Sequence, residues 1–95
     1  CIGAEQRRGT TLRVSAMIKP EGLFGGLAGI WARDILEDGN IRDISFAGAD
    51  ATVLANWQRV ELEHEVGPAA AGLCIGVFYN GLHTIFVDDL QVTYE

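Results

Sequence analysis

The chain has 95 residues, of which 48% are hydrophobic and 21% charged, a composition typical of one folded domain and not of a disordered chain. The formal net charge is −6 and the 7 basic residues are scattered. We therefore expect no nucleic-acid partner, because such partners require clustered Lys and Arg. No apolar run approaches the roughly 20 residues of a membrane-spanning helix, so we expect no membrane partner. We expect residues 1–95 to form a single domain or the C-terminal part of one.

The first predicted strand covers residues 11–20, in which apolar and polar side chains alternate with a period of two. The glycine-rich segment 21–26 predicts a turn, and a second strand is predicted over 27–36. The dipeptide Asp38–Gly39 is typical of a tight hairpin turn. It leads into a third, shorter strand predicted over 41–48.

The second half of the chain continues the same pattern. Residues 49–56 predict a loop, and residues 57–66 form the clearest amphipathic strand. The dipeptide Asn80–Gly81 predicts a hairpin between strands at 73–80 and 83–95. Short strands at regular spacing, with turn signals between them, predict an all-β fold, an antiparallel sandwich or barrel.

The closing strand carries an acidic residue on the face that otherwise looks like core. Strict alternation places Asp88 on the same side as Phe86, Leu90, Val92 and Tyr94. A carboxylate that faces a core must be hydrogen-bonded, charge-paired or metal-bound, because burying it unpaired costs several kcal/mol. Two roles stay open for Asp88: a metal ligand, or an acceptor of hydrogen bonds from hydroxyl or backbone N–H groups.

The two cysteines, Cys1 and Cys74, allow one disulfide, but their spacing matches no metal or redox motif. The position of Cys74 between Leu73 and Ile75 favours a buried, unpaired thiol that packs as a small hydrophobic side chain.

The order of several segments resembles the later strands of jelly-roll domains of the galactose-binding-like and carbohydrate-binding-module type. These segments are "RRGTTLRVSAMIKPEG", "AGIWARD", "NWQRVELEHEV", "CIGVFYNG" and "TIFVDDLQVTYE". The resemblance extends from Gly9 onward and implies a jelly-roll β-sandwich that lacks its opening strands. It further implies a structural calcium ion with Asp88 as a ligand, no required cofactor, and Trp57 as a core-packing residue.

The resemblance also implies a function. Such domains are non-catalytic accessory modules, so the expected role is binding of carbohydrate or a related polar ligand, with a secreted or extracytoplasmic location favoured. The absence of opening strands would leave a hydrophobic edge open. We expect another segment or domain of a larger parent chain, or a second copy of this chain, to cover that edge. The alternative is that the domain is only marginally stable on its own.

A ligand-binding face is predicted from side chains opposite the core sides of the first two strands. An aromatic ring can stack on a sugar ring, while polar groups hold its hydroxyls. Trp31 and Arg33 are the predicted contact residues, with Arg13 and Met17 alongside them on one sheet face. The alternative is that Trp31 is structural, with Arg33 stacked on it.

No catalytic residue is predicted, and we expect the domain not to be an enzyme. His64 shares the register of Val60 and Leu62, which indicates a histidine at the edge of the core with one nitrogen hydrogen-bonded. A Ser–His–Asp or Cys–His arrangement cannot be recognised from sequence alone, because it depends on spatial partners. The rival to a binding module is a structural or protein-interaction domain of a larger protein, without a small-molecule ligand.

Overall fold

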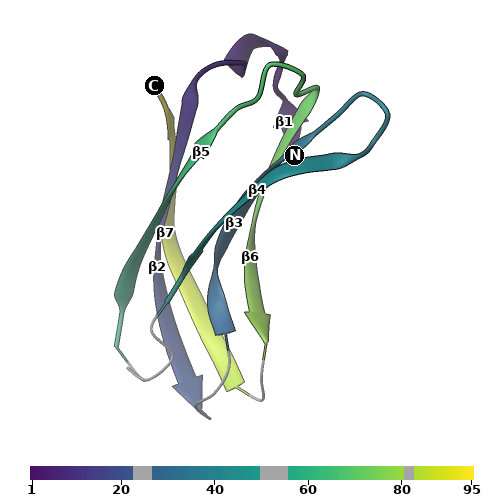
Figure 1. Cartoon of the computed structure of the whole chain (residues 1–95). Coiled ribbons are helices and arrows are strands. Elements are labelled where there is room, and N and C mark those ends of the chain that lie inside the picture. The colour runs from purple at the N-terminus through teal and green to yellow at the C-terminus, as the bar shows by residue number, and fades with distance from the viewer. Residues whose placement is uncertain (23–26, 50–55, 81–82) are drawn as a thin grey trace.

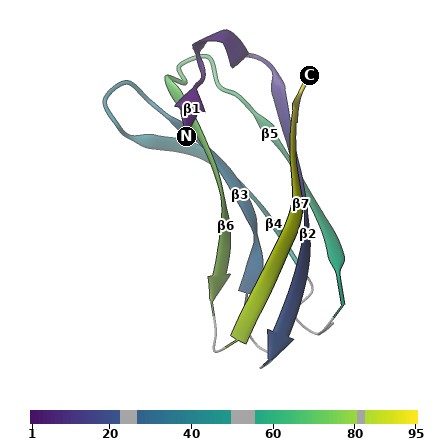
Figure 2. The ribbon, with the colours of Figure 1, turned by 180° about the vertical axis from the view of Figure 1, so that it is seen from behind.

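The computed structural model describes residues 1–22, 27–49, 56–80 and 83–95, which form two antiparallel sheets packed face to face (Figures 1 and 2). In the four-stranded sheet the strands lie in the order β1 (Ile2–Gly3), β6 (Gly72–Asn80), β3 (Leu27–Ile35) and β4 (Ile41–Gly48). In the three-stranded sheet the order is β5 (Gln58–Glu65), β2 (Thr11–Gly22) and β7 (His83–Tyr94). The predicted all-β sandwich is confirmed, and its arrangement is compatible with a jelly roll.

Each of the six predicted strands corresponds to one observed strand, β2 to β7. The two-residue strand β1 was not predicted, because two residues carry no periodic signal. The predicted turn at 21–26, the loop at 49–56 and the Asn80–Gly81 turn lie wholly or partly outside the described residues. No helix among the described residues is long and apolar enough to cross a membrane.

The core lies between the two sheets and follows the alternation in the sequence. On β2 the apolar side chains at every second position are buried, and β5 supplies its own alternating set, Val60, Leu62 and His64. The four-stranded sheet contributes Ile30 and Leu73 from its inner face. The remaining buried hydrophobic residues include Leu12, Val14, Ala16, Ile18, Ala28, Ala32 and Val66.

Two β-bulges break the alternation. In the β2–β7 pair, Ser15 lies opposite Gln91 but Met17 lies opposite Asp88, so β7 holds one extra residue. Asp89, within this bulge, has a φ of 53°, in the left-handed region. Because of this extra residue, even-numbered side chains of β7 point inward on one side of the bulge and outward on the other. The prediction that Asp88 faces the core is therefore wrong, and its side chain is exposed on the outside of the sheet.

The second bulge lies in the β3–β4 pair. Ala32 lies opposite Ser45 while Asp34 lies opposite Arg42, so β4 holds one extra residue. Asp43, within this bulge, has a φ of 55°. This bulge keeps Ser45 on the inner face, opposite the buried Ala32, and places Asp43 beside the same space between the sheets.

Cys1 and Cys74 form a disulfide across 73 residues of sequence. Cys74 is buried, as predicted, but the expectation that its thiol is unpaired is wrong. The bond fastens the first residue of the chain to β6, next to the short β1–β6 pairing at Leu73 and Gly72. The disulfide thus supplies a constraint that two residues of strand pairing would not supply alone.

Candidate functional site

The outer face of the three-stranded sheet carries rows of side chains that run across β5, β2 and β7. The registers place Arg59, Met17 and Asp88 side by side in one such row. Residues directly opposite each other on neighbouring strands have side chains on the same face, close enough to interact. We call this surface the polar face. Its outward residues on the three strands include Arg13, Ser15, Met17, Lys19, Arg59, Glu61, Glu63, Phe86, Asp88, Gln91 and Thr93.

One end of the polar face is an aromatic row with a cation at its centre. The Lys19 Nζ atom lies 5.5 Å from the centre of the Trp57 ring and 5.1 Å from that of the Phe86 ring. Both distances are within the range of cation–π attraction. The two rings remain open to solvent, since Trp57 is 46% exposed and Phe86 44% exposed. They are the exposed aromatic side chains of this sheet face among the described residues.

Beside this row the polar face is hollowed. A cavity of about 220 Å³ is lined by charged and hydrogen-bonding side chains from all three strands: Arg13, Ser15, Arg59, Glu61, Gln91, Thr93 and Glu95. The guanidinium of Arg13 lies 3.0 Å from Glu63 and 3.3 Å from Glu95. Exposed ion pairs of this kind contribute little to stability. A polar ligand could therefore replace one member of such an ion pair at a small cost in free energy.

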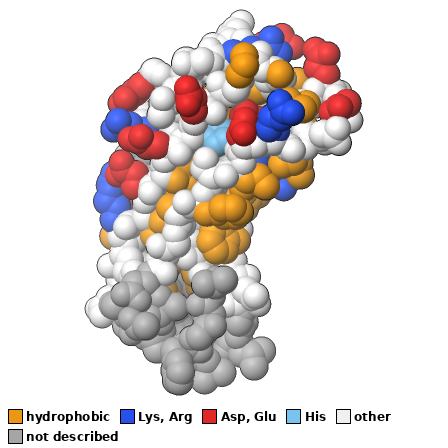
Figure 3. All heavy atoms as spheres, viewed as in Figure 1, with side chains coloured by type: hydrophobic (Ala, Val, Ile, Leu, Met, Phe, Trp, Pro, Cys, Tyr) orange, Lys and Arg blue, Asp and Glu red, His pale blue; other side chains and the backbone are white. Residues whose placement is uncertain are grey.

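The outer face of the four-stranded sheet is apolar. Phe46 and Phe78 meet edge to face with ring centres 5.9 Å apart, and Phe46 is 65% exposed. Trp31 lies over Gly76, where any Cβ atom would overlap the indole ring, and the Arg33 guanidinium lies 4.6 Å from the ring centre. We call this surface the aromatic face. Figure 3 shows the side of the molecule that includes β4. Hydrophobic side chains gather in the middle of this side, away from most of the charged side chains.

The structure separates the four predicted contact residues. Trp31 and Arg33 lie on β3, whereas Arg13 and Met17 lie on β2 in the other sheet. The prediction that they share one face is wrong, because alternation identifies the outward residues of a strand but not the sheet to which the strand belongs. Trp31 is partly buried, and Arg33 stacks on it as the alternative predicted.

Trp57 is also placed differently from the prediction. It was expected in the core, but it is half exposed and lies beside Lys19 on the polar face. Its position just before β5 begins at Gln58 puts it outside the inward register of Val60 and Leu62. The sequence does contain this signal, since Trp57 shares the odd-numbered register of Arg59, which is outward.

The residues around Asp88 do not fit a calcium site. Calcium is held by six to eight oxygens, usually from several carboxylates and carbonyls. The Asp88 side chain is exposed and accepts a hydrogen bond from the backbone N–H of Asp89 at 2.8 Å, while Asp89 accepts one from Gln91. Over the described ranges, no three His, Cys, Asp or Glu side chains are grouped to hold a metal ion.

The sandwich also contains a buried polar network that connects its two sheets. His64 on β5 lies with its Nε2 atom 2.8 Å from Asp34 Oδ1 and its Nδ1 atom 2.8 Å from Ser45 Oγ. Asp34 on β3 and His64 are each 1% exposed. The second oxygen of Asp34 accepts the backbone N–H of Gly67 at 2.9 Å. Each of these buried polar groups therefore has a hydrogen-bond partner.

The donor and acceptor roles in this network follow from the charge states of Asp34 and His64. An ionised carboxylate only accepts hydrogen bonds, so Nε2 of His64 carries the hydrogen that Asp34 accepts. In the neutral ring Nδ1 is then an acceptor, and the Ser45 hydroxyl donates to it. Sequence reasoning gave His64 one hydrogen-bonded nitrogen, but both nitrogens are bonded. Its partners come from two other strands, so the sequence held no signal for them.

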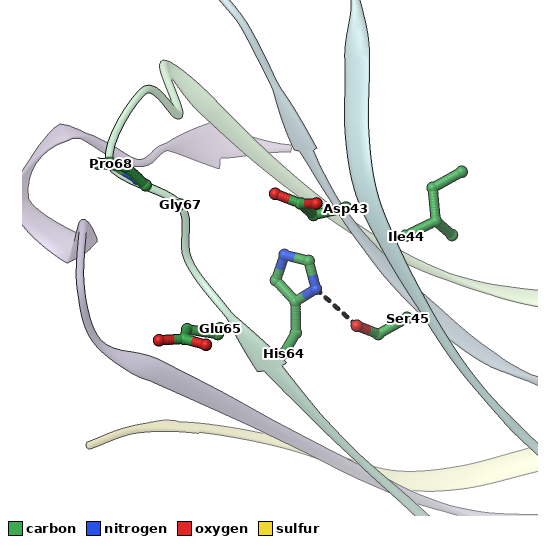
Figure 4. A pocket seen from close by; sticks show the side chains of 7 residues that line it. All are labelled: Asp43, Ile44, Ser45, His64, Glu65, Gly67 and Pro68. Carbon is green, nitrogen blue, oxygen red and sulfur yellow. Dashed lines mark hydrogen bonds between the residues drawn. The ribbon is translucent and has the colours of Figure 1, made fainter.

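A cavity of about 520 Å³ adjoins the network, between the edge of β4 and the end of β5 (Figure 4). Asp43, Ser45 and His64 line it together with Glu65 and Pro68. The order serine, histidine, aspartate is the one used to activate a serine nucleophile. Acyl transfer also needs donors for a developing negative charge, and the charged side chains of this cavity, Asp43 and Glu65, are both acidic.

Comparisons with protein-family models, with curated proteins and with solved structures found no match. What the domain does must therefore be inferred from its own side chains.

Proposed function

We propose that this domain is an accessory binding module for carbohydrate or a related polar ligand, of the galactose-binding-like or carbohydrate-binding-module type, and that the ligand lies on the polar face. The observation that carries this proposal is the aromatic row of Trp57, Lys19 and Phe86 beside a polar hollow. Sugar recognition uses this combination, because a ring stacks on the apolar side of a sugar while polar groups bind its hydroxyls.

The polar face suits this role better than the aromatic face does. Around the hollow, Arg59, Gln91 and Thr93 offer donors and acceptors. Two of the residues predicted as ligand contacts, Arg13 and Met17, also belong to this face. On the aromatic face, by contrast, Trp31 already has Gly76 and Arg33 as neighbours, which leaves less of its ring for stacking.

The test is a glycan-array screen followed by titration of each binding glycan, monitored by tryptophan fluorescence. Trp57→Ala should weaken binding by about 5- to 30-fold, because stacking on an exposed aromatic ring contributes on the order of 1–2 kcal/mol. Phe86→Ala should weaken binding by a smaller factor. Both side chains are exposed, so neither change should unfold the domain.

Trp31→Ala is the matched control, since it removes the other tryptophan from the opposite side of the sandwich. Its affinity should equal that of the wild type, provided that circular dichroism shows a native fold. Equal loss of binding in Trp31→Ala and Trp57→Ala would contradict the assignment to the polar face. Absence of binding to any glycan would refute the carbohydrate proposal itself.

A second candidate is a structural or protein-interaction domain of a larger protein. The aromatic face favours it, because the contiguous Phe46 and Phe78 rings, with Phe46 65% exposed, resemble the aromatic-rich surfaces of protein interfaces. One further variant, Phe46→Ser, separates the two candidates. Loss of a protein partner in Phe46→Ser, with no glycan bound by the wild type, would favour the interaction domain.

A further inference from the structure

One side of the sandwich is closed and the other is open. On the closed side, the inward residues of edge strand β5 are covered, with Val60 5% exposed and Leu62 4% exposed. The open side lies between β6 and β7, one from each sheet, on the near side of the molecule in Figure 2. There the inward residues Val77 and Tyr79 of β6 are 40% and 56% exposed.

The registers show that these exposed residues face the core space. Val77 lies opposite Ile30, which is fully buried, and residues opposite each other point to the same face. On β7, Val87 lies opposite Ile18 and is 39% exposed, although Ile18 is fully buried. Apolar side chains of both strands thus point into the space between the sheets, and they are partly exposed to solvent there.

Two more features belong to the open side. An apolar cavity of about 220 Å³ adjoins it, lined by Cys1, Ile2, Leu12, Leu73, Ile75, Val92 and Tyr94. The edge of β7 there is also unpaired, since β7 pairs only with β2 in the described part of the chain. The neighbouring strand β1 pairs with β6 at Leu73 and Gly72. An unpaired edge presents backbone N–H and C=O groups that can pair with another strand.

We propose that the open side binds one extended strand of a partner protein, which adds to the free edge of β7 by backbone pairing. Strand addition uses the free backbone groups for affinity and places alternate side chains in apolar space. The inward positions of the added strand would be apolar, because they meet Val87 from β7 and Val77 and Tyr79 from β6.

The outward positions of the partner strand should be basic. The described charged side chains of β7 and the residue after it are Asp88, Asp89 and Glu95, all acidic and exposed. Opposite charges across neighbouring strands are favourable, and like charges directly opposite are unfavourable. A second copy of this chain would place one β7 against another and bring together two molecules that each carry a net charge of −6. The charge pattern therefore selects a basic partner over self-association.

The test uses a synthetic peptide of about ten residues, roughly the length of β7, that alternates valine with lysine. Binding to the isotope-labelled protein is measured by NMR titration and by amide hydrogen exchange along β7. We expect slower exchange of β7 amides on binding. A peptide with glutamate in place of lysine, and one with a central proline that removes a backbone donor, should each bind about tenfold more weakly or worse.

Two variants locate the site on the protein. Tyr79→Ser removes an exposed aromatic side chain from the open side and should weaken peptide binding by about tenfold. Phe46→Ser is the matched control, because it removes a more exposed aromatic ring from the outer face of β4. Its peptide affinity should be unchanged.

Three results would overturn the proposal. The lysine peptide could fail to bind a natively folded protein, or the proline peptide could bind equally well. Alternatively, the protein could elute as a dimer without peptide, with its β7 amides already protected, which would make a second copy the occupant. The proposal is independent of ligand binding on the polar face, and the Trp57→Ala and Tyr79→Ser variants test the two sites separately.

Discussion

Replacing His64 by leucine should destabilise the domain more than the loss of one neutral hydrogen bond would. His64→Leu keeps a side chain of similar volume in the core but leaves Asp34 charged and 1% exposed without its imidazole partner. Leaving a buried acceptor without its donor costs about 1–3 kcal/mol, and more when the acceptor is charged. Asp34 retains the Gly67 N–H at 2.9 Å, so we expect a loss of about 3 kcal/mol.

That loss is large for a chain of this size. A 95-residue domain is expected to have an unfolding free energy of about 5–14 kcal/mol, and a loss of about 3 kcal/mol lowers the melting temperature by about 12–24 °C. Ser45→Ala removes only a neutral, partly exposed hydrogen bond and should cost about 1 kcal/mol. The double variant Asp34→Asn/His64→Leu removes the buried charge and should be more stable than His64→Leu by about 1 kcal/mol.

The assay is urea unfolding monitored by circular dichroism and tryptophan fluorescence, with the slope m compared among variants. Agreement of the two signals checks that unfolding is two-state. A loss in His64→Leu below about 1 kcal/mol, or a double variant less stable than His64→Leu, would refute the view that the buried carboxylate depends on the imidazole.

Three further predictions concern other parts of the fold. Reducing the Cys1–Cys74 disulfide should lower the unfolding free energy by about 4 kcal/mol, because it releases a loop of 73 residues; no change in the urea midpoint with reductant would contradict this. Gly29→Ala should destabilise the domain by about 1–3 kcal/mol, since its Cβ would overlap the backbone of β4, whereas Gly48→Ala, with 3.6 Å to its nearest contact, should be near neutral in the same assay. A fluorophosphonate probe should leave Ser45 unmodified by mass spectrometry, because its cavity is acidic; a stoichiometric adduct that is lost in Ser45→Ala would show instead that the serine is an activated nucleophile.

The strands could be predicted from the sequence because alternation is a local property. Segment 41–48 coincides with β4, and the other predicted strands differ from the observed ones by a few residues at their ends. The bulges could not be predicted in this way. Each adds one residue to one strand, at Asp43 and Asp89, and so reverses the inward and outward faces beyond it. This is why Asp88 was assigned to the wrong face.

The candidate sites depended on information that the sequence does not contain. Neither sheet membership nor the neighbours of a side chain across the sandwich follow from periodicity. Trp31 and Arg13 were therefore grouped although they lie on opposite sheets. The Asp34–His64 pair joins residues 30 apart in sequence through strands of different sheets, so the position of His64 in an inward register was the only local sign of it.

The central claim is that the ligand lies on the polar face, and the two tryptophans provide a direct measurement. Because the chain contains only Trp31 and Trp57, a ¹H–¹⁵N NMR spectrum of the wild-type protein should show two indole N–H signals, assignable with the Trp→Ala variants. On titration with the glycan that binds best in the array, the Trp57 signal should shift while that of Trp31 stays in place. A shift of the Trp31 signal with Trp57 unchanged would place the ligand on the opposite face and contradict the account.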